Sequence, residues 1–292
     1  MTSPVQRLVG KSTVLGDGMT ITRTLPMARR RTVGAWCFLD HFGPIEVHAD
    51  HGMRVGPHPH IGLQTVTWLL EGEILHRDSL GSVQVICPGQ LNLLTSGRGI
   101  SHSEESPATR SPRLHGAQFW IALPDHARHG EPAFVHHDTL PACQHQGLQV
   151  TVFIGELLGL VSPANVHSPL VGAELRAADA TQTALPLRPD YEHGIQVLTG
   201  RLTVDGEVLE PGTLLVLDIG RDIVSVQAEA GSCAVLVGGA PLQEELLMWW
   251  NFVGRSKQEL LAACTDWNAG AAYFGDVKDY DGERLSAPMP PW

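Results

Sequence analysis

The sequence lacks the features of membrane-spanning and nucleic-acid-binding proteins. The 292 residues contain no stretch of 18 apolar residues, and the N-terminal segment has neither an apolar core nor a small-residue cleavage site, so we expect a cytoplasmic protein without membrane contact. Basic residues are few, since 20 Lys and Arg stand against 31 Asp and Glu. The resulting net charge of −11 disfavours direct contact with nucleic acid or anionic lipid.

Cysteine is scarce, and its spacing matches no known paired motif. The five cysteines are widely separated and form no Cys-x-x-Cys motif, which indicates a reducing compartment and excludes a disulfide framework or a thiolate zinc site. Histidine, by contrast, is abundant: fifteen histidines exceed what a surface would carry by chance and favour a metal site. With 43% hydrophobic and 17% charged residues, 31 Gly and 20 Pro, the chain has the composition of a compact protein with many turns.

The hydrophobic pattern predicts an all-β protein. Short runs rich in Val, Ile, Leu, Thr and Trp recur between Gly, Pro and Asp clusters, as in TVTWLLEGEILHRD and LQVTVFIGELLG, which is typical of antiparallel strands in a sandwich or barrel. One helix is expected at about residues 256–268. Ser256 and Glu259 have the spacing of a capping box there, and Leu260, Leu261, Cys264 and Trp267 are expected on one face.

Two parts of the sequence echo each other. The strand and turn around Gly72 resemble those around Gly200, and CPGQLNLL at Gly89 resembles EPGTLLVL at Gly212. We interpret this echo as two copies of one antiparallel β-barrel, of the jelly-roll type, with residues 1–138 as the N-terminal domain and 139–292 as the C-terminal domain. Each echo is only a few residues long, so a chance similarity of strand and turn patterns is the alternative.

A candidate metal site lies in the first half. His58 and His60 precede a strong strand pattern and, two residues apart, point to one face of an extended chain; His102 and Glu104 repeat this spacing after the next strands. Three neutral imidazoles and a carboxylate suit a divalent first-row metal and leave two positions of an octahedral ion open. The alternative is that a single His-x-His arises by chance and Pro59 marks an irregular edge strand.

Longer motifs carry a family resemblance. The segments HPHIGLQTVTWLLEGEILHRDSLG, LDHFGP and SGRGISHSEES resemble the pirin family of two-domain cupins over residues 36–124. The resemblance implies a bicupin fold. It also implies an N-terminal barrel whose metal, most often iron as Fe(II) with Zn, Mn, Ni or Cu as alternatives, is held by residues equivalent to His58, His60, His102 and Glu104.

The second barrel is expected to lack a metal. Pro186 and Arg188 stand where the echo would place the counterparts of His58 and His60, and His193 aligns with no ligand. Gln64 occupies a position where many cupins carry a glutamate, so the single carboxylate ligand would be Glu104. The C-terminal segment from Gly238 onward resembles the family's ending only loosely.

The resemblance leaves three functional hypotheses. The first is a metal-dependent oxidoreductase similar to quercetin 2,3-dioxygenase, acting on a flavonol-like phenol and dioxygen, with Glu104 as a catalytic proton acceptor. The second is a non-enzymatic metal- or redox-sensing regulator that binds a protein partner. The third is a structural cupin in which the metal only stabilises the barrel.

Several other residues near these motifs have a structural interpretation. His76-Arg77-Asp78 is interpreted as part of a hairpin turn, with a supporting role behind the metal ligands as the alternative. His115 is interpreted as a core histidine, with a place near the metal as the alternative. The three aromatic residues of the central strands, Trp68, Phe119 and Trp120, are expected to pack in the core.

Overall fold

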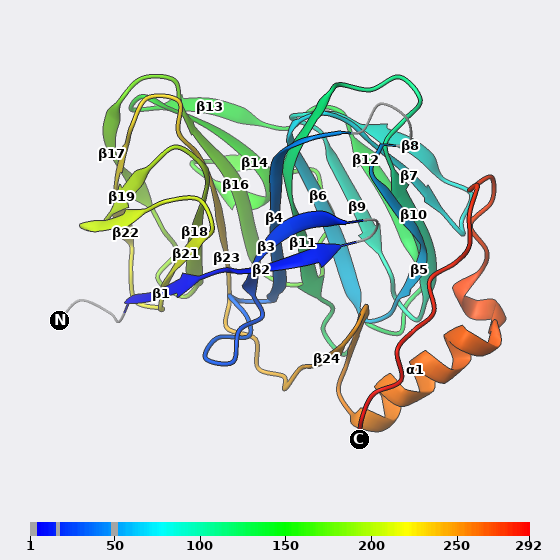
Figure 1. Cartoon of the computed structure of the whole chain (residues 1–292). Helices are drawn as coiled ribbons and strands as arrows, with labels where there is room; N and C mark the ends of the chain where they lie inside the picture. The colour runs from blue at the N-terminus through cyan, green and yellow to red at the C-terminus, as the bar shows by residue number, and fades with distance from the viewer. Residues whose placement is uncertain (1–4, 16–17, 48–51) are drawn as a thin grey trace. The chain divides into compact units, whose positions relative to one another are not determined.

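The computed structural model describes residues 5–15, 18–47 and 52–292 and shows an all-β chain with one α-helix, as predicted (Figure 1). The chain divides into two compact units. Unit 1 contains Met1–Thr13, Thr22–His41 and His137–Leu242, and unit 2 contains Val14–Ile21, Phe42–His136 and Gln243–Trp292. Each unit thus combines segments that are far apart in the sequence. The division into domains 1–138 and 139–292 stays a prediction about domain boundaries.

Unit 1 is built on two antiparallel sheets. The larger sheet has the order β1-β21-β18-β23-β16-β14-β13, with β15 beside β14, and the smaller has the order β17-β22-β19-β20. The strands of the larger sheet are β1 (Val5–Val9), β13 (Ala142–His145), β14 (Leu148–Leu157), β15 (Leu160–Val161), β16 (Leu170–Ala177), β18 (Glu192–Thr199), β21 (Thr213–Leu217) and β23 (Cys233–Gly239). Those of the smaller sheet are β17 (Thr181–Pro186), β19 (Leu202–Val204), β20 (Glu207–Leu209) and β22 (Ile223–Ala228).

The core of unit 1 lies between its two sheets. Alternate residues of each strand point to the same face, so Val150 and Val152 of β14 contribute to one apolar cluster with Val224 and Val226 of β22. All four side chains are at most 1% exposed. Each such side chain contributes about 1.5–3 kcal/mol when its apolar surface is buried.

Unit 2 holds the second pair of sheets. One sheet has the order β12-β9-β6-β11-β4-β3-β2 and the other β5-β10-β7-β8. The strands of the first are β2 (Lys11–Leu15), β3 (Met19–Leu25), β4 (Trp36–Glu46), β6 (Leu63–Glu71), β9 (Leu91–Thr95), β11 (Arg113–Ala122) and β12 (Ala133–His137), several of which extend beyond this unit. Those of the second are β5 (Arg54–His60), β7 (Ile74–Asp78), β8 (Val83–Ile86) and β10 (Ile100–Glu105).

The strand orders confirm the duplication. The order β5-β10-β7-β8 matches β17-β22-β19-β20, and β12-β9-β6-β11 matches β1-β21-β18-β23. The echoed glycines occupy equivalent turns: Gly72 and Gly200 follow β6 and β18, Gly89 and Gly212 precede β9 and β21, and all four have positive φ. The first strand of the chain, β1, therefore takes the place in unit 1 that β12 takes in unit 2.

The predicted helix is α1 (Lys257–Ala269), in unit 2. Ser256 caps it by accepting a hydrogen bond from the Glu259 backbone N–H at 3.1 Å, whereas the Glu259 carboxylate accepts from the Arg255 N–H rather than completing the box at Ser256. Leu260, Cys264 and Trp267 are buried as predicted, but Leu261 is 38% exposed and lies outside the buried face.

The rest of the C-terminal segment also belongs to unit 2. It contains the hairpin of β24 (Leu247–Trp249) and β25 (Phe252–Gly254) and the 3-10 helix η1 (Ala272–Phe274). Phe252, Leu260 and Trp267 form an apolar cluster with Ile61, the residue that follows β5. Within the described ranges, no helix is long and apolar enough to cross a membrane.

Candidate metal centre

Two neighbouring strands bring the predicted histidines together. In the antiparallel pair β5 and β10, His102 lies directly opposite His58, and Ile100 lies opposite His60. β5 is the edge strand of its sheet, which is where a strand tolerates Pro59, since proline has no N–H to donate. The edge-strand alternative is therefore correct as a description of β5, and it is compatible with the histidine cluster.

His58, His60 and His102 form a buried group that could hold a metal ion. One candidate ligand atom from each ring lies within 4.8 Å of the others. The ring centroids are 4.3 Å apart for His58 and His102, 4.9 Å for His60 and His102, and 5.1 Å for His58 and His60. The rings of three histidines are thus gathered around one point.

Backbone carbonyls orient two of the rings. The Nδ1 of His58 lies 2.8 Å from the Gly56 carbonyl oxygen, and the Nδ1 of His60 lies 2.9 Å from the Asn251 carbonyl oxygen. A carbonyl oxygen only accepts, so each Nδ1 carries the proton and each Nε2 keeps its lone pair in the neutral ring.

The third ring is oriented by side chains. Asp78 accepts from the Nε2 of His76 at 3.1 Å, which leaves the Nδ1 of a neutral His76 as an acceptor. The Nδ1 of His102 lies 3.4 Å from that nitrogen and can donate to it. Asp78 is itself fixed by the backbone N–H groups of Leu80 and Ser82, both at 2.9 Å. The Asp78–His76 pair therefore leaves the Nε2 of His102 with its lone pair, as in the other two rings.

The resulting donor set is suited to a cation. The Nε2 atoms of His60 and His102 face each other at 3.0 Å, and under this assignment both are acceptors with no proton between them. Burial lowers the pKa of all three imidazoles, to about 4 for His58, and the neighbouring imidazoles lower it further for His60 and His102. Neutral, converging imidazoles are the form in which histidine binds a divalent metal.

The hairpin of β24 and β25 places the Asn251 carbonyl. Its two-residue turn consists of Trp250, whose φ is +51°, and Asn251. The Val253 N–H donates to the Ile61 carbonyl at 3.2 Å, which joins the hairpin to the end of β5. A segment nearly 200 residues away in sequence thus orients His60, and nothing in the side-chain pattern indicates this contact, because a backbone carbonyl leaves no sequence signal.

Glu104 lies beside the group rather than within it. It follows His102 on the same face of β10 and lies opposite His76 of β7. A Glu104 carboxylate oxygen accepts from the Thr67 hydroxyl at 3.4 Å, and burial raises the pKa of this carboxyl. The Glu104 carboxylate is not part of the 4.8 Å histidine group, so its role as a fourth ligand stays a prediction.

The remaining predicted residues divide between core and site. Trp68 and Phe119 are at most 1% exposed, as expected for core residues. Trp120 is buried too, but its ring meets the His60 ring edge-on with 5.2 Å between centroids, a contact the sequence did not reveal. His115 is buried on β11 and is not in the histidine group. His76-Arg77-Asp78 ends β7 at a hairpin turn, as predicted, and also supports His102.

The paired double-sheet units and the histidine group in one of them define a two-domain cupin. Comparison with known proteins agrees. The family model described as Pirin matches residues 18–121, and the Pirin C-terminal cupin domain matches residues 172–273. The chain belongs to the pirin family.

Individual relatives cover nearly the whole chain. A Pseudomonas aeruginosa protein provisionally named quercetin 2,3-dioxygenase PA1205 is 49% identical over 99% of this chain and 91% of its own length. A pirin-like protein of Caulobacter vibrioides is 38% identical over 92% of this chain and 94% of its own. A crystal structure of quercetin 2,3-dioxygenase from Acinetobacter baumannii has a TM-score of 0.96 at 46% identity, covering 98% of this chain and 96% of that one.

Proposed function

We propose that this pirin is a metal-dependent dioxygenase that acts on a flavonol or a similar phenolic compound, with His58, His60, His102 and Glu104 as metal ligands and Fe(II) as the metal. The observation that supports it is the set of three buried imidazoles whose Nδ1 atoms all face hydrogen-bond acceptors. The names of the Pseudomonas and Acinetobacter relatives point to the same chemistry.

The protein's own residues would bind and orient the metal and the substrate. A divalent metal held here would supply a Lewis acid for a phenolic oxygen and a centre for dioxygen chemistry. The carbonyls of Gly56 and Asn251 and the Asp78–His76 pair fix the three rings before any ion arrives. Preorganised ligands of this kind bind more tightly than ligands that must first be ordered.

Glu104 is proposed as the catalytic proton acceptor. Its buried carboxyl, with a pKa raised by desolvation, would take the hydroxyl proton of the phenol, which leaves the substrate oxygen negative. The Thr67 hydroxyl, 3.4 Å from a Glu104 carboxylate oxygen and 2.9 Å from the Gln118 side-chain oxygen, can donate its single proton to one of these acceptors at a time.

The proposal is tested by metal analysis of the purified protein together with dioxygen uptake in the presence of quercetin. We expect about one metal ion per chain and uptake that is lost in the His58→Ala/His60→Ala variant. The matched control replaces two exposed histidines of the same unit, His126→Ala/His129→Ala, and should keep both metal and uptake. A Glu104→Gln variant that binds metal and keeps full turnover would contradict the proton-acceptor role.

The outcomes separate this function from the other hypotheses. One metal per chain without dioxygen uptake on any phenol would favour the metal-sensing regulator or the structural role. Absence of metal from protein produced with excess iron would contradict the proposed site itself.

A further inference from the structure

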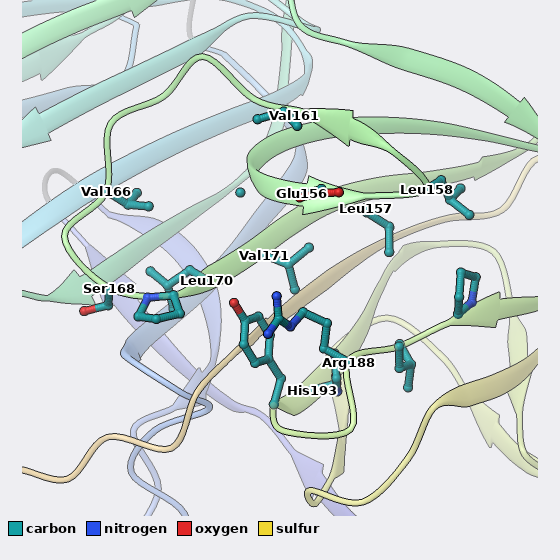
Figure 2. A pocket seen from close by; sticks show the side chains of 15 residues that line it. Glu156, Leu157, Leu158, Val161, Val166, Ser168, Leu170, Val171, Arg188 and His193 are labelled. Carbon is teal, nitrogen blue, oxygen red and sulfur yellow. The ribbon is translucent and has the colours of Figure 1, made fainter.

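Unit 1 contains a cavity of about 500 Å³ at one end of its two sheets (Figure 2). The end of β14, the start of β16 and the segment between β17 and β18 surround it, and all of these belong to unit 1. The volume is within the range of about 300–1,000 Å³ that small-molecule sites occupy. Most of the wall is apolar, including Leu157, Leu170 and Val171.

The cavity lies at the end of β17, the strand whose place in the sheet order matches that of β5 in unit 2. Pro186 and Arg188, which the sequence echo aligns with His58 and His60, both line it. Unit 1 therefore has a hollow beside the counterpart of the histidine-bearing strand, and the two aligned residues there are not imidazoles.

One polar group is buried in the cavity wall. His193 of β18 shares a strand face with Ile195 and Val197, both of which belong to the core cluster between the sheets, so its ring points inward. The residue is 1% exposed and lines the cavity. Among the described residues, no hydrogen-bond partner is available to its Nδ1. A buried polar atom without a partner carries a free-energy cost that a bound molecule would remove.

One guanidinium and two carboxylates lie at the cavity. Arg188 lies over the Tyr191 ring at 4.6 Å and binds both carboxylate oxygens of Asp190, at 3.1 and 2.8 Å. Glu156 adds a carboxylate to the lining. An anionic ligand would meet Glu156 and would compete with Asp190 for Arg188. An ion of either sign would also lose hydration against the mostly apolar wall, so the cavity favours a neutral molecule.

The buried imidazole of His193 limits which functional group of a ligand can bind beside it. Burial lowers the pKa of His193 to about 4, so the ring is neutral near pH 7. A neutral imidazole offers one donor and one acceptor, and the tautomer decides which of them stands at Nδ1. A hydroxyl group can form a hydrogen bond with Nδ1 in either tautomer, because it both donates and accepts. A carboxylate only accepts and an ammonium group only donates.

We propose that this cavity is a second ligand site, which binds a neutral apolar molecule through a hydroxyl group hydrogen-bonded to Nδ1 of His193. The apolar wall would hold the body of the ligand, and the stacked Arg188 and Tyr191 side chains would flank it. The site is independent of the proposed metal centre, because every residue that forms it belongs to unit 1.

The test measures 2-naphthol binding by isothermal titration calorimetry to the full chain carrying His58→Ala/His60→Ala, so that the proposed metal centre cannot contribute. We expect saturable binding of one equivalent. We also expect at least tenfold weaker binding for 2-methylnaphthalene, which replaces the hydroxyl by a methyl group, and for 2-naphthoate, which replaces it by an anion.

Two further substitutions locate the site. His193→Leu removes the ring nitrogen and should weaken 2-naphthol binding at least tenfold. Val166→Trp, in the loop that borders the cavity, should weaken it without altering β18, and Val208→Trp, an exposed position of the same unit outside the cavity, should not. Absence of saturable binding would overturn the proposal. So would 2-naphthol binding by the His193→Leu and Val166→Trp variants that is as tight as binding by the chain without these substitutions.

Discussion

The position of a single proton decides what each histidine of the candidate centre can do. A neutral imidazole binds a metal through the nitrogen that lacks the proton, so the hydrogen bond at the other nitrogen selects the ligand atom. In this protein that bond goes to a backbone carbonyl for His58 and His60 and to a side chain for His102. Three different supports thus produce the same tautomer in three rings.

Side-chain spacing predicted that His58 and His60 share a face, and the family resemblance added His102 to them. The two-residue period of a strand places His58 and His60 on one face, and the antiparallel pairing of β5 with β10 adds His102. The supports were harder to predict. His76 and Asp78 were interpreted as part of a hairpin turn, with a supporting role behind the ligands as the alternative. Their place beside His102 depends on the pairing of β7 with β10, which the sequence does not specify.

His193 makes an acid-dependent contribution to stability that can be measured. Burial holds the folded-state pKa of His193 at about 4, below the unfolded value of 6.5, although Asp190 opposes this shift. The unfolded chain therefore binds more protons between these values, and stability present above pH 6.5 is lost as the pH falls towards 4.

We expect the wild type to lose about 2 kcal/mol more unfolding free energy between pH 7 and pH 5 than His193→Gln, which does not titrate there. Urea unfolding of the metal-free proteins at the two pH values measures this difference. Equal losses in the two proteins would show that His193 is protonated as easily in the folded state as in the unfolded chain.

Among the elements of the fold, the hairpin of β24 and β25 has an effect beyond its own length. It contacts the chain at Gly62, whose φ is +70° and where an added Cβ would lie 2.2 Å from the Val253 carbonyl oxygen. A side chain at this position must push the hairpin away from the end of β5. The Asn251 carbonyl would then no longer hold His60.

Gly62→Ala is therefore expected to weaken metal binding by about 10- to 100-fold, the usual cost of losing a group that orients a metal ligand. Titration of the metal-free protein with Fe(II) under anaerobic conditions measures it. Gly89→Ala is the matched control, because Gly89 also has a positive φ, +81°, but an added Cβ there meets no atom within 4 Å. If both variants lose affinity equally, backbone strain rather than the hairpin contact is responsible.

Local signals located the helix but not everything about it. Ser256 marks its start because the capping hydrogen bond is formed within four residues. The buried face was predicted one residue too wide, since Leu261 is exposed: the width of that face depends on what packs against it, here Phe252 and Ile61, which are distant in sequence. The pairing of β1 with β21 is equally non-local.

For the molecule as a whole, the two units are expected to respond differently to metal. An ion that binds only the folded state adds about 2.7 kcal/mol of stability at 100 times its Kd. Because the histidine group lies entirely in unit 2, we expect the gain there and not in the unfolding of unit 1.

Calorimetry with and without Fe(II) under anaerobic conditions tests this. Fe(II) should raise the unfolding temperature of unit 2 in the wild type and should leave it unchanged in the His58→Ala/His60→Ala variant. A shift of the same size in that variant would mean that the metal binds elsewhere.

The repeated architecture was predictable because it leaves two copies of one pattern in the sequence. Gly72 and Gly200 mark the same turn, since each needs a positive φ after an equivalent strand. The composition of the units was not predictable. β1, from the start of the chain, belongs to unit 1, and the last fifty residues belong to unit 2. Neither assignment leaves a local pattern in the sequence, because each depends only on the strand or sheet that the segment joins.

This assignment of the two chain ends affects the order in which a ribosome can complete the protein. β1 leaves the ribosome early, but its partner β21 is synthesised about 200 residues later, an interval of about 10–40 s at 5–20 residues per second. The Asn251 carbonyl that orients His60 follows later still. Neither unit can be completed until these segments have been translated. During that time the strand edges that await their partners must be protected from pairing with other chains.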